Sequence, residues 1–183
     1  GDDLADFPTD YESGYVRLYF SAQGEAIADK SQVKSSGNFP RVYTVRRFNQ
    51  AAKELTIDMS LHGENNGPGA TWANNSKPGE HILMTGPGLS KRVNHEADWF
   101  LFAGDMAGLP ALASSLEQLP DNAQGYALVE VVSEADQQDL KVPEGIALKW
   151  IVNDKPGENT DNLIDEIKSL NWKSGNPFAW VAC

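Results

Sequence analysis

The sequence predicts a two-domain protein, in which an antiparallel β domain is followed by an α/β domain with a parallel sheet. Three observations carry this prediction. Short strand-like segments separated by turn-rich loops fill the first half of the chain. Apolar runs alternate with helical patterns in the second half, which is typical of a parallel sheet covered on both faces. The pattern changes near Asp98, so we place the domain boundary near residue 95.

Four segments of the first half have the composition of strands. Tyr15–Phe20 alternates in part, and Arg41–Phe48 is dense in β-branched and aromatic residues. In Glu54–His62, apolar side chains recur at every second position and share one face, as in a half-buried strand. Pro-Gly at 78–79 and Gly-Pro-Gly at 86–88 predict the two ends of a fourth strand. Such short strands predict an antiparallel barrel or sandwich.

The second half contains four apolar strands and two amphipathic helices. The final helix is predicted by the stripe Leu163, Ile164, Ile167 and Leu170, with Thr160 as its N-cap. In chain order we expect a strand at 99–103, a helix at 106–119, strands at 126–132 and 147–152, a helix at 160–170 and a strand at 178–182.

Composition excludes several classes of function. The net charge of −11 disfavours nucleic acid and anionic membranes, which both attract basic surfaces. No apolar run approaches the roughly 18 residues of a membrane helix, and the amino terminus lacks the pattern of a signal peptide. A single cysteine, Cys183, excludes an internal disulfide and suits a reducing compartment. We therefore expect a cytoplasmic monomer that binds small molecules and neither nucleic acid nor membrane.

Arg41 and Tyr43 form the first candidate site. On a strand both side chains point to the same face, about 7 Å apart. A guanidinium can fork onto a phosphate, a phenol ring offers a stacking surface, and Thr44 adds a hydroxyl. These residues suit a phosphorylated flat ring system. The alternative is an exposed arginine on an ordinary strand.

The segment from His62 to Ala73 forms the second candidate site. Its glycines let backbone amides approach an anion closely, and a helix starting at Ala70 would favour a pyrophosphate at its amino end. The alternative is a hairpin loop with a short helical turn. Because no second histidine lies at metal-ligand spacing, we expect no metal site.

Gly104 and Asp105 form the third candidate site, between an apolar strand and a helix. Ligands of open parallel sheets bind beyond the carboxyl ends of the strands. The dinucleotide fingerprint G-x-G-x-x-G is absent from the sequence, so an ordinary strand–turn–helix connection is the alternative. Neither a G-x-S-x-G elbow nor a P-loop is present.

The order of these motifs resembles the siderophore-interacting proteins, a branch of the ferredoxin–NADP reductase superfamily. The motifs are R-x-Y-T at 41–44, H-G-x-x-x-G-P-x-x-x-W-A at 62–73, P-G-x-x-x-x-x-x-G-P-G at 78–88, G-D-x-x-x-L-P-A at 104–111 and A-W-V-A at 179–182. The resemblance implies that residues 1–95 form an FAD-binding antiparallel β-barrel lacking its first strand. It implies that residues 96–183 form an NAD(P)H-binding α/β domain lacking its C-terminal segment.

The resemblance also implies roles for individual residues. Arg41 would hold the flavin phosphates, Tyr43 would pack on the isoalloxazine and Thr44 would hydrogen-bond near its N5 edge. Tyr43 and Thr44 are therefore the catalytic candidates. The further candidates for cofactor binding are Val45, His62, Gly67, Ala70, Thr71, Trp72, Gly104 and Asp105.

The implied activity is reduction of ferric siderophores to release ferrous iron, with electrons passing from NAD(P)H through FAD. Where the family reads G-D-E-T-A-L-P-A, this chain has Met106, Ala107 and Gly108, and so lacks a carboxylate and a hydroxyl near the cofactor cleft. This difference leaves open a flavoprotein that is reduced by ferredoxin instead. A siderophore-binding module without enzymatic activity is the other alternative.

Overall fold

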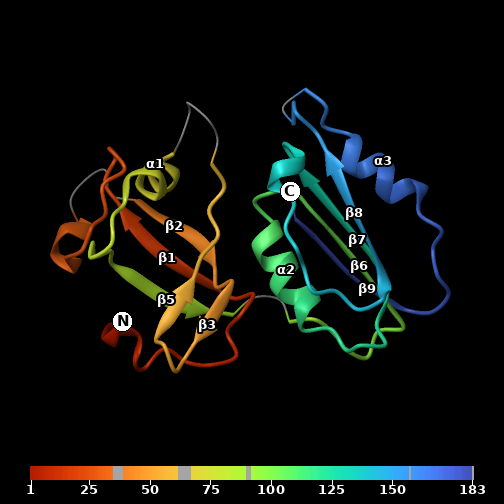
Figure 1. Cartoon of the computed structure of the whole chain (residues 1–183), viewed down its shortest axis with the longest axis horizontal. Helices are drawn as coiled ribbons and strands as arrows, with labels where there is room; N and C mark the ends of the chain where they lie inside the picture. Colours follow the sequence, from red (N-terminus) through yellow and green to blue (C-terminus); the bar gives the residue numbers. More distant parts are fainter. Residues whose placement is uncertain (35–38, 62–66, 90–91, 157, 183) are drawn as a thin grey trace. The chain divides into compact units, whose positions relative to one another are not determined.

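The computed structural model describes the chain apart from residues 35–38, 62–66, 90–91, 157 and 183. The chain divides into two compact units, Gly1–Ser90 and Lys91–Cys183 (Figure 1). Strands pair antiparallel in the first unit and parallel in the second, as the sequence predicts. Among the described residues, no helix combines the length and the hydrophobicity that a membrane crossing requires.

The main sheet of the first unit has β1 (Tyr15–Phe20) between β2 (Phe39–Thr44) and β5 (Met84–Gly88). Burial alternates along β1, where Val16, Leu18 and Phe20 face the core and the intervening side chains are half-buried. This alternation is the period of a strand with one covered face. The 3₁₀ turns η1 (Asp2–Leu4) and η2 (Lys30–Lys34) flank the sheet in the sequence.

The predicted strand Arg41–Phe48 is two strands. β2 ends at Thr44, and β3 (Arg47–Asn49) pairs with β4 (Glu54–Thr56) in a separate two-stranded sheet. Between them, the amide of Val45 donates to Gly14 and its carbonyl accepts from Ser13. These bonds end the β2 ladder, so the chain leaves one sheet for the other at this point.

The predicted strand Glu54–His62 is also shorter in the structure. β4 ends at Thr56, and residues 57–61 lie outside the strands. Leu55, Ile57 and Met59 nevertheless point into one cavity, so the common face inferred from their alternation is confirmed. Leu61 does not continue this face, because half of its surface is exposed.

The Pro-Gly and Gly-Pro-Gly pairs do not mark the ends of β5. The strand begins at Met84 and includes Gly86, Pro87 and Gly88, because pairing with β1 continues as far as Tyr15 opposite Gly88. The absence of a side chain at Gly88 is required there, since a Cβ would overlap the Tyr15 ring. Before β5 in the chain, the helix that was expected to start at Ala70 is present as α1 (Pro68–Asn75) and begins two residues earlier.

The second unit is a four-stranded parallel sheet with strand order β8-β7-β6-β9. Helices α2 and α3 lie on opposite faces of this sheet (Figure 1). Phe100, Phe102 and Phe178 pack beneath α2, whereas Leu128 and Ile151 pack beneath α3. The elements are β6 (Trp99–Gly104), α2 (Leu109–Glu117), β7 (Gln124–Val131), η3 (Glu134–Asp136), β8 (Gly145–Val152), α3 (Asn162–Ser169) and β9 (Pro177–Ala182).

The four strands and two helices predicted for this half are all confirmed, but two details of α3 are wrong. Its N-cap is Asp161 and not Thr160, and Asp161 makes no capping hydrogen bond with its side chain. Ile164 is 45% exposed, while Leu163 is buried. The apolar stripe therefore follows the i, i+4 spacing from Leu163 to Ile167, and Ile164 lies about 100° further round the helix.

Candidate functional site

Arg41 and Tyr43 lie on the same face of the main sheet of the first unit, as expected from their spacing. Tyr43 is opposite Val16 in the register, and Arg41 is opposite Leu18. Residues directly opposite in an antiparallel pair share a face. The exposed guanidinium and the half-buried phenol therefore emerge on the face that bears the core of this unit.

The Tyr43 phenol is seated against the amino end of α1. A Cβ at Gly69 would overlap the Tyr43 hydroxyl and would lie 2.9 Å from its Cζ. Gly69 therefore provides the space in which the phenol packs on the helix. The glycines of this segment were expected to let amides approach an anion closely, and at Gly69 the group that approaches the backbone is the Tyr43 phenol.

Phe20 links Tyr43 to Trp72 of α1. Its ring lies edge-on to Tyr43, with centroids 6.4 Å apart, and is tilted against Trp72 at 5.9 Å. The Phe20 side chain has no exposed surface. Three elements, β1, β2 and α1, thus meet in one aromatic cluster, which we call the Phe20 cluster (Phe20, Tyr43 and Trp72).

The amino end of α1 suits an anion. Gly67 is its N-cap and Pro68 follows, so among the described residues the N-cap position offers no side chain to the first amides. The first turn contains no acidic residue, and Ala70 is buried there. Thr71 is held beside the turn at Gly24, where a Cβ would lie 2.8 Å from the threonine Cβ. Uncapped amides and the helix dipole together favour a phosphate group.

Burial favours the neutral form of the Tyr43 phenol. It raises the pKa of Tyr43, and the Arg41 guanidinium lowers this pKa by a smaller amount. At neutral pH the phenol therefore adds no negative charge that would oppose the permanent charge of Arg41. The pair therefore combines a stacking surface with an anion-binding group.

The remaining candidates from the first half of the chain lie in different environments. Thr44 is half-buried opposite Tyr15, so its side chain lies on the other face of the sheet from Tyr43. Val45 is fully buried in the core. His62 lies outside the described residues. The structure thus brings Arg41, Tyr43 and the start of α1 together, and separates the Thr44 side chain from them.

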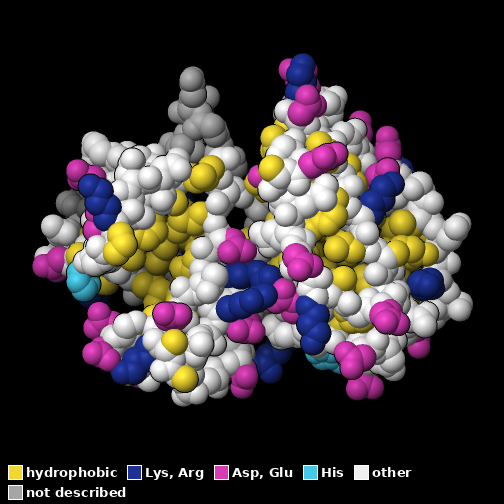
Figure 2. Space-filling view, in the orientation of Figure 1, with side chains coloured by type: hydrophobic (Ala, Val, Ile, Leu, Met, Phe, Trp, Pro, Cys, Tyr) yellow, Lys and Arg dark blue, Asp and Glu magenta, His cyan; other side chains and the backbone are white. Residues whose placement is uncertain are grey.

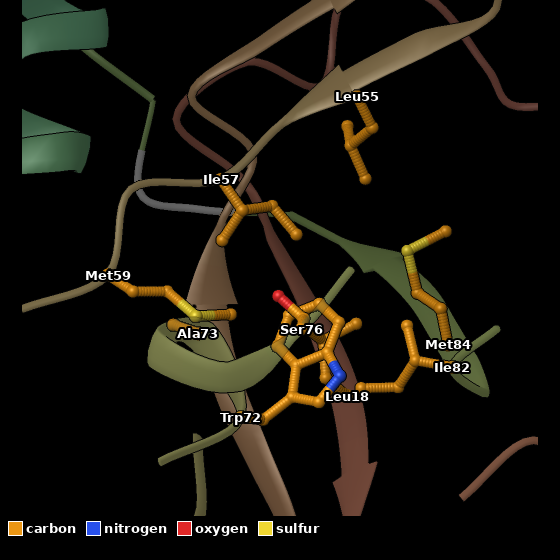
Figure 3. Close-up of a pocket in the computed structure, with 9 residues that line it drawn as sticks. All are labelled: Leu18, Leu55, Ile57, Met59, Trp72, Ala73, Ser76, Ile82 and Met84. Carbon is orange, nitrogen blue, oxygen red and sulfur yellow. The ribbon is translucent and has the colours of Figure 1, made fainter. Parts of the chain in front are cut away.

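The first unit contains an apolar cavity of about 410 Å³, and the Trp72 side chain forms part of its lining (Figure 3). In the space-filling view, hydrophobic side chains line a hollow in this unit (Figure 2). The Trp72 nitrogen is buried and has no hydrogen-bond partner within the described chain. With so few polar groups, the cavity suits an apolar ligand and not a phosphate. Its lining is Leu18, Leu55, Ile57, Met59, Trp72, Ala73, Ser76, Ile82 and Met84.

Gly104 and Asp105 lie at the carboxyl end of β6 in the second unit. A Cβ at Gly104 would lie 2.9 Å from the carbonyl oxygen of Ala182, and the Asp105 amide donates to that same oxygen. The Asp105 carboxylate accepts from the amides of Ala107 at 2.9 Å and Gly108 at 3.0 Å. The Asp105 carboxylate therefore closes the turn that precedes α2, a helix whose N-cap is Gly108.

Comparison with known proteins places both units in the same family. Residues 1–91 match the siderophore-interacting FAD-binding domain, and residues 97–183 match the siderophore-interacting protein family. The chain is 35% identical over 84% of its length to the ferric vibriobactin reductase ViuB of Vibrio cholerae, and spans 59% of that relative. It is 32% identical over 73% of its length to the NADPH-dependent ferric-chelate reductase of Escherichia coli, and spans 51% of it.

Solved structures agree with this relationship. The siderophore-interacting protein SipS from Aeromonas hydrophila superposes with a TM-score of 0.81 at 31% identity, over 99% of this chain and 69% of SipS. The ferredoxin–NADP⁺ reductase of Plasmodium falciparum (H286L mutant) shares the fold at 18% identity, with a TM-score of 0.60 over 90% of this chain and 66% of that protein. The ferredoxin reductase-like fold expected from the sequence is thus confirmed. The chain belongs to the siderophore-interacting protein family.

Proposed function

We propose that this chain is the FAD-binding and NAD(P)H-binding part of an enzyme that reduces ferric siderophores and releases ferrous iron. One observation carries the proposal. Arg41 and Tyr43 share a face beside an uncapped helix start, in the unit that matches an FAD-binding domain. A cation, a ring and free amides are the groups that recognise a phosphorylated flavin.

The residues fit FAD on physical grounds. Gly69 leaves the space at the start of α1 in which the Tyr43 phenol is seated, so the stacking ring lies directly against this helix start. We assign the pyrophosphate to Arg41 and the α1 amides, with Gly67, Ala70 and Thr71 in that helix turn. Tyr43 would stack on the isoalloxazine. Trp72 supports this surface from the Phe20 cluster.

Bound FAD would supply the redox chemistry, by accepting a hydride from a nicotinamide and passing single electrons to ferric iron. The role of the chain is to bind and to orient. Arg41 neutralises phosphate charge, and the neutral Tyr43 phenol adds no competing anion. Thr44 is a proposed contact of the flavin edge, and the buried Val45 is proposed to support that edge from the core, since its amide and carbonyl already bond to Gly14 and Ser13. His62 is proposed as a contact from the same motif.

The substrate and the electron donor are inferred from the relatives. One relative is named as a reductase of ferric vibriobactin, and another as an NADPH-dependent ferric-chelate reductase. Ferric siderophores and NAD(P)H are the corresponding proposals for this chain. Reduction to ferrous iron weakens binding to hard oxygen ligands, which releases the metal from the chelate.

Flavin binding and ferric reduction are tested together. The purified chain is titrated with FAD, while flavin absorbance and fluorescence are recorded, and unbound FAD is then removed. Retained flavin absorbance is the expected result. The loaded protein is mixed with NADPH and a ferric siderophore in the absence of oxygen, and ferrous iron is measured with a coloured ferrous chelator. A chain that retains no flavin, or that yields no more ferrous iron than free FAD does, contradicts the proposal.

The turn that Asp105 closes before α2 favours a second candidate, a flavoprotein that receives electrons from ferredoxin. The Asp105 carboxylate places a negative charge in this turn and already occupies the amides of Ala107 and Gly108, so the turn is unsuited to a cofactor phosphate. Rapid mixing of the FAD-loaded chain with NADPH or with reduced ferredoxin separates the two. Fast bleaching by ferredoxin together with slow bleaching by NADPH supports the second candidate.

A further inference from the structure

Phe20 occupies the centre of the Phe20 cluster, although nothing in its sequence context marks it as functional. It is the last residue of β1, and its side chain has no exposed surface. Its ring contacts one group from each of two neighbouring elements, Tyr43 of β2 and Trp72 of α1. A Cβ at Gly69 would also lie 3.6 Å from the Phe20 ring.

The geometry of the contacts that Phe20 makes with Tyr43 and Trp72 can fix the orientation of both rings. The Phe20 and Tyr43 rings are 80° apart, which is the edge-to-face arrangement that aromatic pairs favour. The Phe20 and Trp72 rings are tilted by 54° at 5.9 Å. Because Phe20 is held in a β1 strand that is paired on both sides, it is a fixed support for both rings.

The remaining contacts of Tyr43 leave its orientation dependent on this support. Its hydroxyl is seated in the space left by Gly69, which places one end of the ring on α1. The T-shaped contact with Phe20 fixes the tilt of the Tyr43 ring about that end. Without an aromatic ring at position 20, the phenol could rotate within this seat, and Trp72 of α1 would lose its ring contact with β1.

We infer that Phe20 is a positioning residue for the flavin site, which sets the orientation of the Tyr43 ring and fixes α1 beside it. The inference rests on the proposed function, because it concerns the binding of FAD. We propose no direct contact between Phe20 and the cofactor, because the Phe20 side chain is fully buried. Its effect reaches the flavin through Tyr43 and through the start of α1.

A matched pair of variants separates positioning from packing. Phe20→Leu removes the ring at the centre of the cluster. Phe7→Leu removes another buried ring from the same core. Phe7 packs on Phe48 with centroids 4.7 Å apart and, within the described part of the chain, makes no ring contact with the Phe20 cluster. Both variants lose a buried aromatic side chain, so both are expected to lower the unfolding temperature.

Only Phe20→Leu is expected to change the flavin site. We expect its FAD dissociation constant to rise about three- to tenfold, the equivalent of one aromatic contact. We also expect bound flavin to fluoresce more strongly, because a misoriented phenol quenches it less. Phe7→Leu is expected to bind FAD as the wild type does, with the same absorbance and fluorescence.

Epistasis provides the second arm of the experiment. Tyr43→Ala removes the ring through which Phe20 acts, so adding Phe20→Leu to Tyr43→Ala should change FAD affinity less than it does in the wild type. An equal effect in both backgrounds overturns the inference. So does a Phe20→Leu variant whose flavin affinity and fluorescence match those of Phe7→Leu.

The wild-type titration distinguishes the two levels of failure. A wild-type chain that binds no FAD overturns the proposed function and this inference together. If the wild type binds FAD and the two phenylalanine variants behave alike, the positioning role alone is wrong and the proposed function stands.

Discussion

Arg46 and Asp58 form an ion pair in the first unit, with the arginine Nε 3.5 Å from the aspartate Oδ2. Arg46 is 6% exposed and Asp58 31% exposed. The pair connects the residues that follow β2 to those that follow β4, and the Arg46 amide also donates to the Thr56 carbonyl. It therefore holds together the two places where the chain leaves its sheets.

Asp58→Asn is expected to destabilise the first unit by roughly 1–3 kcal/mol, because it removes the negative charge of Asp58 from beside a buried guanidinium. Asp2→Asn is the matched control. Asp2 pairs with Lys53 at 2.6 Å but is 95% exposed, so the same change there should cost no more than about 0.5 kcal/mol. Urea unfolding of both variants measures the difference, and equal costs would contradict a structural role for the Arg46 pair.

Arg41→Ala is expected to weaken FAD binding roughly 10- to 100-fold, because charge-assisted hydrogen bonds to phosphate contribute about 1.5–3 kcal/mol. Arg17→Ala is the control. Arg17 lies on the other face of the same sheet, with its guanidinium over the Tyr15 ring. Fluorescence titration with FAD gives both constants. Full flavin retention by Arg41→Ala would remove Arg41 from the site.

Alkaline pH is expected to destabilise the first unit through Tyr43. Burial raises the pKa of Tyr43 against a smaller opposing effect of Arg41, so the folded chain binds the phenolic proton more tightly than the unfolded chain does. This stabilisation is complete below the unfolded value of about 10 and is lost as the pH rises through the folded pKa.

The comparison for this prediction is Tyr43→Phe, which has no phenolic proton. Its free energy of unfolding should fall less than that of the wild type between about pH 8 and pH 10.5, the interval that reaches the ordinary tyrosine pKa. Parallel pH dependences of the two proteins would show that the Tyr43 phenol titrates as in the unfolded chain.

Substitution of Asp105 is expected to loosen the turn that precedes α2. Asp105→Ala removes the acceptor of the Ala107 and Gly108 amides and should cost about 1 kcal/mol. Asp105→Asn keeps an oxygen acceptor and loses only the attraction of a negative charge for the helix dipole, about 0.3–1 kcal/mol. The expected order of stability is wild type, then Asn, then Ala. Thermal unfolding measures it, and an alanine variant as stable as the wild type would exclude a stabilising role for these two hydrogen bonds.

Local patterns were sufficient for most of the fold. The alternation of Val16, Leu18 and Phe20 predicted β1 because a strand with one buried face has a period of two. The apolar run at Trp99–Gly104 is buried at every position, as expected for a strand covered by helices on both faces. The spacing of Arg41 and Tyr43 predicted their common face for the same reason, since every second side chain of a strand points the same way.

Local patterns failed where long-range pairing decides the outcome. Val45 ends β2 because its backbone bonds to Ser13 and Gly14, which are distant in the sequence. Residues 57–61 keep an alternating pattern without forming a strand, since alternation does not supply a pairing partner. The Gly-Pro-Gly segment reads as a turn, yet it is part of β5 because β1 extends alongside it.

The sequence by itself determined the β and α/β division, the family resemblance and the presence of a cation, a phenol and a glycine-rich helix start. Only the tertiary structure decided that the phenol is seated on Gly69, that Phe20 joins it to Trp72 and that Asp105 closes the turn before α2. The physical reason is that periodicity fixes which way a side chain points, whereas contacts between β1, β2 and α1 depend on how separate elements pack.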